Sequence, residues 1–433
     1  MAMDKRKLLL GEENPNTLSS MANLAATYRK QGKWKEAEAL EVLVMEKSKY
    51  LLGEEHPETL TGMANLAATY RKQGKWKEAE ALEVLVMEKS KYLLGEEHPD
   101  TLTGMANLAA TYRYQGKWKE AEALEVLVME KRKYLLGEEH PDTLTGMANL
   151  VATYRHQGKW KEAKALQVLV IVKSKHLLGE EHPDTLSSMA NLAATYRHQG
   201  KWKKAEALQV LVIEKRKYLL GEEHPDTLLI MGNLAATYRN QGKWKEAETL
   251  QVLVMEKRRY LLGEDHPDTL TSMANIAAIY RDQGKRKEAE ALELLVMEKS
   301  KYLLGEDHPD TLSSMANIAA IYRDQGKWKE AEALELLVME KSKYLLGEEH
   351  PDTLSSVANL ATTYYTQGKW KEAEALQVLV MVKSKHLLGE EHPDTLTSMG
   401  NLAATYRDQG KWKKAEALEV LVMKKRKYLL GEE

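Results

Sequence analysis

The chain has 433 residues, 30% of them charged, and its 63 Lys and Arg nearly balance 65 Asp and Glu, for a formal net charge of −2. This balance argues against a general nucleic-acid binder, which needs a net basic surface to displace phosphate counterions. Cysteine is absent, which excludes disulfides and Cys-ligated zinc. The sequence has neither a signal-peptide pattern nor an apolar run of about 18 residues that could span a bilayer. We therefore expect a cytoplasmic protein.

One pattern fills almost the whole sequence and returns every 42 residues. At residues 98–139 it reads HPDTLTGMANLAATYRYQGKWKEAEALEVLVMEKRKYLLGEE. One such unit cannot bury its apolar face alone, so neighbouring units must stack. We predict ten tandem repeats over residues 17–433, the last slightly truncated, after the tail of a preceding repeat at residues 1–16. The same threonine marks each copy: Thr17, Thr59, Thr101, Thr143, Thr185, Thr227, Thr269, Thr311, Thr353 and Thr395.

The sequence begins and ends within the tail of a unit. Residues 4–17, DKRKLLLGEENPNT, match EKRKYLLGEEHPDT at residues 130–143, and residues 429–433 again read LLGEE. Neither end shows the polar capping helix that usually keeps a solenoid soluble. We expect a segment of a longer protein, or an artificial array.

Each unit predicts two antiparallel helices. His-Pro-Asp-Thr at residues 98–101 places Pro near a helix start, and Asp or Thr where a side-chain oxygen can cap free N–H groups. Apolar residues then follow i, i+3, i+4 spacing until Gly116 ends the helix. A longer helix follows from about Trp118 to Gly137, with basic residues near its negative end. A turn of a few residues makes the two helices antiparallel, so the chain is predicted to be all-α.

These residues resemble a known family. The pattern LAxxYxxxGxWxxA at residues 108–121 resembles the tetratricopeptide signature. The 42-residue spacing, the LGEEHPDTL junction and the MANLAxTYRxQGKWKEAE core resemble a long-unit subclass. That subclass occurs in kinesin light chains and in the C-terminal arrays of fungal nucleotide-binding receptors of the NB-ARC or NACHT type. One departure is Glu125, which stands where the superfamily usually has an aromatic residue.

The resemblance implies an all-α tetratricopeptide solenoid that forms a right-handed superhelix. Its first helices would line a concave groove for ligand peptides, and the chain would hold no cofactor and have no enzyme activity. The sequence agrees with the last point, because it contains no P-loop, dinucleotide-binding, zinc-protease or nucleophile-elbow motif. We interpret the repeated His-Pro-Asp as a turn and helix cap, since each His lies a whole repeat from the next.

The resemblance places one Asn of each unit in the groove. An amide can donate to and accept from a peptide backbone without reading its side chains. The alternative is a hydrogen bond between helices without any ligand, and both remain open. The residues are Asn23, Asn65, Asn107, Asn149, Asn191, Asn233, Asn275, Asn317, Asn359 and Asn401.

An arginine ladder runs beside the Asn ladder, interrupted by Tyr365. Guanidinium groups facing the groove would favour an acidic peptide or a C-terminal carboxylate. The alternative, which the overall neutrality favours, is pairing with Glu side chains of an adjacent helix. The ladder consists of Arg29, Arg71, Arg113, Arg155, Arg197, Arg239, Arg281, Arg323 and Arg407.

The position directly after each arginine varies from basic through aromatic to acidic. We hypothesise that it sets ligand specificity repeat by repeat, and the alternative is drift at an exposed helix end. It is occupied by Lys30, Lys72, Tyr114, His156, His198, Asn240, Asp282, Asp324, Thr366 and Asp408. A further exception is Arg286, which replaces the Trp of the other copies and predicts a local soft spot around residues 269–305.

The leading interpretation is a non-catalytic scaffold that binds a protein or peptide, as the ligand-sensing repeat domain of a fungal nucleotide-binding immune-type receptor. One alternative is a kinesin-light-chain-like cargo adaptor. Another is an artificial, self-stacking array without a ligand, because uncapped ends favour head-to-tail self-association. Neither nucleic acid nor a membrane is expected as a partner.

Overall fold

A computed structural model describes residues 8–430, so residues 1–7 of the expected N-terminal tail and residues 431–433 lie outside it. Over residues 8–430 the chain forms helices and short connections, with no strand. The predicted all-α repeat solenoid is confirmed. No helix in this described part is long and apolar enough to cross a lipid bilayer. The chain divides into two compact units, Met1–Thr153 and Tyr154–Glu433.

Each repeat contributes an even-numbered helix followed by an odd-numbered one. The even-numbered helices are α2 (Pro15–Lys30), α4 (Pro57–Lys72), α6 (Pro99–Tyr114), α8 (Pro141–His156), α10 (Pro183–His198), α12 (Pro225–Asn240), α14 (Pro267–Asp282), α16 (Pro309–Asp324), α18 (Pro351–Thr366) and α20 (Pro393–Asp408). The odd-numbered helices are α3 (Trp34–Leu52), α5 (Trp76–Leu94), α7 (Trp118–Leu136), α9 (Trp160–Leu178), α11 (Trp202–Leu220), α13 (Trp244–Leu262), α15 (Arg286–Leu304), α17 (Trp328–Leu346), α19 (Trp370–Leu388) and α21 (Trp412–Leu430).

The His-Pro-Asp motif starts the even-numbered helices, with the His as the capping residue. In α6, Nδ1 of His98 accepts a hydrogen bond from the backbone N–H of Asp100 at 3.2 Å. In α2, Oδ1 of Asn14 takes the same role for the N–H of Asn16 at 3.0 Å. The predicted capping role of the motif is confirmed. The prediction that its Asp or Thr supplies the cap is wrong.

The buried Thr of the motif connects consecutive repeats instead. Oγ1 of Thr101 donates to the backbone C=O of Gly95 at 2.9 Å, which ties the start of α6 to the end of α5. Gly95 has a φ of 93°, in the left-handed region that favours glycine. The turn between repeats is thereby fixed by two residues of the repeated pattern.

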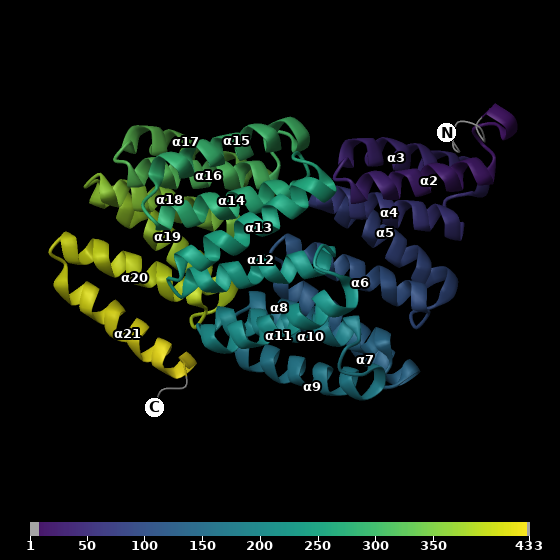
Figure 1. Ribbon diagram of the computed structural model, residues 1–433, viewed down its shortest axis with the longest axis horizontal. Helices are drawn as coiled ribbons and strands as arrows, with labels where there is room; N and C mark the ends of the chain where they lie inside the picture. Colours follow the sequence, from purple (N-terminus) through teal and green to yellow (C-terminus); the bar gives the residue numbers. More distant parts are fainter. Residues whose placement is uncertain (1–7, 431–433) are drawn as a thin grey trace. The chain divides into compact units, whose positions relative to one another are not determined.

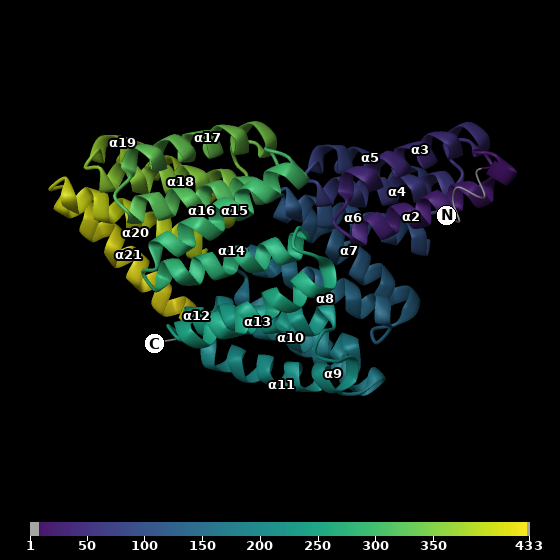
Figure 2. The ribbon, with the colours of Figure 1, turned by 45° about the horizontal axis from the view of Figure 1, so that its top comes forward.

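The helices of a repeat pack in two layers. Figure 1 shows α15 and α17 side by side in one layer and α14 and α16 side by side in the other. Figure 2 shows α17 and α19 in the same relation to α16 and α18. Successive even-numbered helices also contact each other directly: α12 contacts α14, and α14 contacts α16. The even-numbered helices therefore form the inner layer of the stack.

Small apolar clusters join the layers at several repeats. Around α14 it consists of Leu270, Met273 and Val296, with Met255 and Leu292 packed at its edge. Burial of one such side chain contributes about 1.5–3 kcal/mol. Because Met255 belongs to the preceding repeat, each cluster depends on a neighbour, as expected for a solenoid.

A polar clamp joins the repeats at their turns. Lys117 Nζ and Gln115 Nε2 both donate to the carboxylate of Glu80 in the preceding repeat, each at 2.8 Å. The ammonium of Lys117 also lies 5.2 Å from the ring centroid of Tyr112. The repeated QGKWKEAE segment therefore serves stacking between units.

Candidate functional site

The inner layer contains clefts between consecutive even-numbered helices. One cleft, of about 150 Å³, lies between α14 and α16, and α15 also lines it. Leu270, Ala274 and Val296 form apolar parts of its wall, and Ser300 and Asn317 contribute polar groups. A second cleft, of about 110 Å³, lies one repeat further on, between α16 and α18, lined by residues at the corresponding positions. The groove of this unit thus has side-chain-sized recesses at the repeat spacing.

The repeated Asn residues lie at these clefts. Asn275 and Asn317 line the first cleft, and Asn359 lines the second. Nδ2 of Asn317 also donates to the carboxylate of Glu293 at 3.0 Å. Asn317 therefore combines the two alternatives from the sequence: it lines a cleft, and it makes a hydrogen bond between helices.

The arginine ladder is largely paired within the protein. Arg71 lies 3.2 Å from the Glu83 carboxylate on the following odd-numbered helix, and its guanidinium donates to the C=O of Asn107 in the next repeat at 2.9 Å. Arginine–glutamate pairs of this kind are Arg29–Glu41, Arg71–Glu83, Arg113–Glu125, Arg323–Glu335 and Arg407–Glu419, at 2.9–3.4 Å. In these repeats the pairing alternative has geometric support.

In other repeats the arginine of the ladder pairs with a carboxylate at a second position. That position is the last residue of the next even-numbered helix, and it is the variable position described in the sequence analysis. There Asp282 pairs with Arg239 at 2.5 Å, and Asp324 pairs with Arg281 at 3.4 Å. Where Tyr365 interrupts the ladder, its hydroxyl donates to Asp408 of the next repeat. The acidic residues of the variable position therefore contact the preceding repeat.

Two arginines have no carboxylate at either of these two positions. For Arg155 the positions hold Gln167 and His198, and for Arg197 they hold Gln209 and Asn240. Arg155 donates to the C=O of Asn191 at 3.4 Å. Within residues 8–430 no acidic side chain pairs with Arg197, and burial lowers the pKa of its guanidinium. Arg197 is therefore an arginine of the ladder that lacks an acidic partner in this part of the chain.

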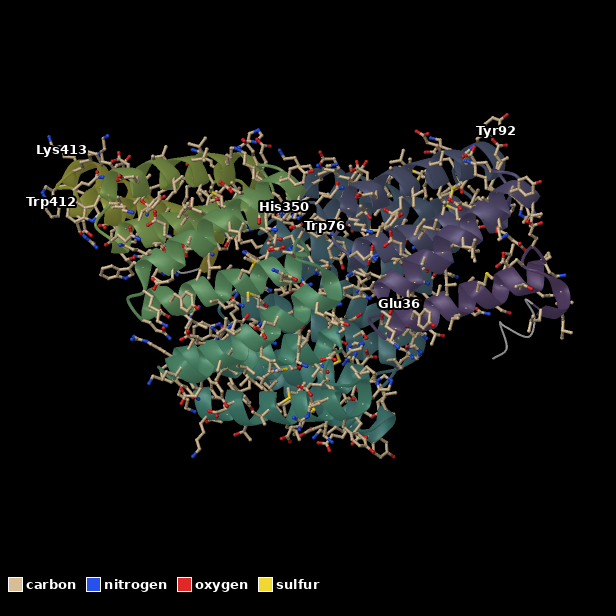
Figure 3. The ribbon with its side chains drawn as sticks, turned by 90° about the horizontal axis from the view of Figure 1, so that it is seen from above. Glu36, Trp76, Tyr92, His350, Trp412 and Lys413 are labelled. Atoms are coloured by element: carbon tan, nitrogen blue, oxygen red, sulfur yellow. The ribbon has the colours of Figure 1, made fainter. Side chains whose placement is uncertain are left out.

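The aromatic members of the variable position cover the Trp of the preceding repeat. Tyr114 stacks on Trp76 at 6.2 Å and His198 stacks on Trp160 at 5.7 Å, measured between ring centroids. Trp76 is 9% exposed, whereas Trp412, on the last helix α21, is 64% exposed. Both side chains are labelled in Figure 3. The Trp of a repeat is thus buried only where an aromatic side chain of the next repeat covers it.

This corrects the expectation for Arg286. Its flanking counterparts Trp244 and Trp328 are 43% and 45% exposed, so Arg286 replaces a surface Trp rather than a packed one. The helix it starts, α15, has the same length as its neighbours. The structural premise of a large local loss of packing is therefore wrong.

The repeat geometry agrees with comparisons to known proteins. Tetratricopeptide repeat patterns match residues 17–58, 59–100, 101–142, 311–352, 353–394 and 395–433, and a second set matches residues 149–217, 191–256 and 226–301. The chain belongs to the tetratricopeptide repeat family. Tetratricopeptide arrays are in general non-catalytic scaffolds, and they bind proteins or peptides.

Several solved tetratricopeptide structures are similar. Nearly identical TPR-like repeats of a putative kinesin light chain from Podosopora anserina share 30% identity over 48% of this chain and 98% of that one, with a TM-score of 0.41. A Rap protein complexed with competence and sporulation factor shares 13% identity over 87% of this chain and 100% of that one, with a TM-score of 0.57. The apo quorum sensor NprR from B. thuringiensis shares 16% identity over 85% of this chain and 99% of that one, with a TM-score of 0.52. The last two show the same fold. No curated protein matches the sequence.

Several odd-numbered helices contain a buried carboxylate at the same position of the repeat. Burial raises the pKa of Glu41, Glu83, Glu125 and Glu335 despite their arginine partners. The pKa of Glu293 is raised furthest, to about 7, because burial outweighs the hydrogen bonds from Asn317 and Ser314 and the charge of Arg281. Glu293 therefore titrates near neutrality.

His198 lies close to several basic groups. Although the residue is exposed, desolvation by the surrounding protein and then the charges of Arg197, Arg155 and His156 lower its pKa to about 4. The imidazole is therefore neutral at physiological pH. Within residues 8–430, no group of three His, Asp or Glu side chains is placed to hold a metal ion.

One cleft-lining position was not identified from the sequence. In the last turns of the odd-numbered helices, the repeated KSK segment alternates with KRK, and its central residue lines the clefts as Ser300 and Ser342. The alternation was visible in the sequence. Its meaning was not, because only the stack shows that this outer helix reaches the inner groove.

Proposed function

We propose that this chain is a non-catalytic, cytoplasmic scaffold that binds an extended protein segment along its even-numbered helices. The observation that carries the proposal is the recurrence of equivalent clefts, between α14 and α16 and between α16 and α18. Each combines apolar walls with amide and hydroxyl groups, which suits a peptide backbone with side chains inserted at intervals. A pull-down from a random peptide library on the whole chain tests it, and failure to enrich any peptide would refute it.

The same proposal includes an acidic ligand, with its carboxylate at α8 and α10. There Arg197 has no carboxylate at either of the two positions that serve the other arginines, Arg155 adds a second positive charge, and the neutral His198 lies beside them. A ligand carboxylate would supply charge-assisted hydrogen bonds to Arg197. Together with the Asn groups of the inner layer, this region would hold an acidic side chain or a C-terminus.

Asn240→Asp tests this part, because it gives Arg197 the acidic partner that Asp282 gives Arg239. Binding of acidic library peptides should weaken about tenfold, since a hydrogen bond to a charged group contributes about 1.5–3 kcal/mol. Thr366→Asp is the matched control, because Arg323 already has Glu335 at 2.9 Å. Equal weakening by both variants, or by neither, would contradict the assignment.

We further propose that the array is the ligand-sensing part of a fungal nucleotide-binding receptor, on the strength of the LGEEHPDTL junction and the MANLAxTYRxQGKWKEAE core. A P-loop encoded upstream in the gene would support the receptor, and a heptad region would support a kinesin-light-chain-like adaptor.

Val420 and Met423 of α21 are 39% and 52% exposed, which favours self-association of the array. Sedimentation at several concentrations tests that alternative.

A further inference from the structure

One position in each odd-numbered helix is either Ser or Arg. The serines are buried, and they are Ser48, Ser90, Ser174, Ser300, Ser342 and Ser384. The arginines are Arg132, Arg216, Arg258 and Arg426. Flanking lysines are present in nearly every copy, so the chain changes this one side chain while keeping its surroundings.

Beside two of these serines, Ser300 and Ser342, the structure has a cleft. Ser300 lines the 150 Å³ cleft between α14 and α16, and Ser342 lines the 110 Å³ cleft between α16 and α18. A cavity of about 150 Å³ lined by apolar side chains is large enough for a benzene-sized group. The larger cleft can therefore receive one apolar side chain of moderate size, and the smaller cleft a smaller one.

Where the residue is Arg, its guanidinium lies against the cleft wall. Arg216 donates to the C=O of Asp226 at 2.9 Å and to Oγ of Ser187 at 2.8 Å. By position in the repeat, Asp226 corresponds to Asp310 and Ser187 to Thr271, both of which line the open cleft beside Ser300.

The other arginines behave in the same way. Arg258 donates to the C=O of Asp268 at 3.0 Å and to Oγ of Ser272 at 2.9 Å, and Arg132 donates to the C=O of Asp142 at 3.2 Å. Arg216 is 4% exposed, so its guanidinium occupies space inside the stack. The arginine side chain thus fills the volume that serine leaves open.

We infer that the Ser/Arg position opens or plugs the clefts, and that Ser300, Ser342 and Ser384 make one continuous binding stretch along α14 to α20. This inference rests on the proposed scaffold function and deepens it. Arg258 closes the stretch on its N-terminal side. The occupant is an extended segment that inserts an apolar side chain into each successive cleft.

The repeat spacing specifies the conformation of that segment. Packed helices lie about 8–10 Å apart, and α14, α16 and α18 touch one another in sequence. Three residues of polyproline II rise about 9 Å and bring every third side chain to the same face. Three residues of a β-strand rise a similar distance of about 10 Å but turn the side chain to the opposite face. The occupant is therefore a polyproline II segment with an apolar residue at every third position.

Peptides of about twelve residues provide the probe: Val-Pro-Pro repeats with the three-residue period, and Val-Pro repeats with a two-residue period. Fluorescence anisotropy on the whole chain should show tighter binding of the Val-Pro-Pro peptide. Ser342→Arg should weaken that binding about tenfold or more, because one buried apolar side chain contributes about 1.5–3 kcal/mol. Arg258→Ser should strengthen it by adding a fourth cleft to the stretch.

The controls separate plugging from misfolding. Ser342→Arg copies a residue that Arg216 and Arg258 already place at this position, and circular dichroism checks that the helices remain. Ser174→Arg makes the same change at a serine that lies between Arg132 and Arg216 in the repeat order, outside any continuous stretch, and should leave binding unchanged.

Equal affinity of the two peptide periods, or binding unaffected by Ser342→Arg, would overturn the inference. If the library enriches other peptides while Val-Pro-Pro does not bind, the polyproline II occupant is refuted and the scaffold function stands. Failure of the library itself would remove both.

Discussion

Replacing Glu293 by Gln should stabilise the C-terminal unit at high pH and not at low pH. Glu293 is 1% exposed on α15, and its usual partner Arg281 instead pairs with Asp324 at 3.4 Å. Its pKa is raised to about 7 from 4.5, so the folded state binds the proton more tightly than the unfolded chain. The associated stability is fully present below about pH 4.5 and is lost as the pH rises through 7.

The magnitude follows from the pKa. At 1.36 kcal/mol per pKa unit, a rise from 4.5 to about 7 corresponds to about 3 kcal/mol as an upper limit at pH 8. Gln removes this cost, because it carries no charge and its Oε1 can still accept from Asn317. Repeats with Gln167, Gln209 and Gln251 already show that the stack accommodates the amide.

Native-state hydrogen exchange of α15 and α16 is the appropriate assay, because a solenoid opens locally and a single global unfolding energy is not defined for it. At about pH 8 the variant should show up to about a hundredfold greater protection than the parent chain, and at about pH 5 a much smaller difference. Glu335→Gln is the matched control, and it should gain less because it removes the partner of Arg323 at 2.9 Å. Equal protection of variant and parent at pH 8 would refute the reasoning.

Two further predictions concern single positions. Arg286→Trp should change the stability of α15 by less than about 1 kcal/mol, since Trp244 and Trp328 are 43% and 45% exposed; a gain of several kcal/mol by hydrogen exchange would show a packed site instead. Gly263→Ala should destabilise by about 1 kcal/mol because its φ is 96°, whereas Gly400→Ala, in the interior of α20 with no heavy atom within 4 Å of the added Cβ, should stabilise by about 0.5–1 kcal/mol. Hydrogen-exchange protection of the surrounding helices should therefore fall for Gly263→Ala and rise for Gly400→Ala, and a change of the same sign for both would contradict the backbone explanation.

The helix boundaries could be predicted from the sequence because local chemistry determines them. Pro99 starts α6 and Gly137 follows α7, as the pattern of breakers and apolar spacing indicated. The identity of the cap could not be predicted in the same way. His98 accepts the hydrogen bond that we expected Asp100 or Thr101 to accept, because Thr101 is drawn into a bond with Gly95 of the preceding repeat.

The groove positions could be predicted only in part. Asn275 and Asn317 line the first cleft, and their role in ligand binding stays a prediction from the family resemblance. The serines could not be placed there, because Ser300 belongs to an outer-layer helix whose end reaches the groove only through stacking. The exposure of each Trp was also beyond the reach of a single repeat, since the residue that covers it comes from the next one.

The residues that differ between the repeats are therefore best interpreted together with the residues that they contact in the neighbouring repeat. Asp282 pairs with Arg239 of the preceding repeat, and Asp408 accepts a hydrogen bond from Tyr365 of the preceding repeat. Because each such residue belongs to an interface, exchanging one repeat for another changes two interfaces at once. A repeat carrying Asn240 in place of Asp282 would leave Arg239 with a carboxylate at neither of the two positions, as is the case for Arg197. The charge pairing along the arginine ladder is thus set by the order of the repeats as much as by their composition.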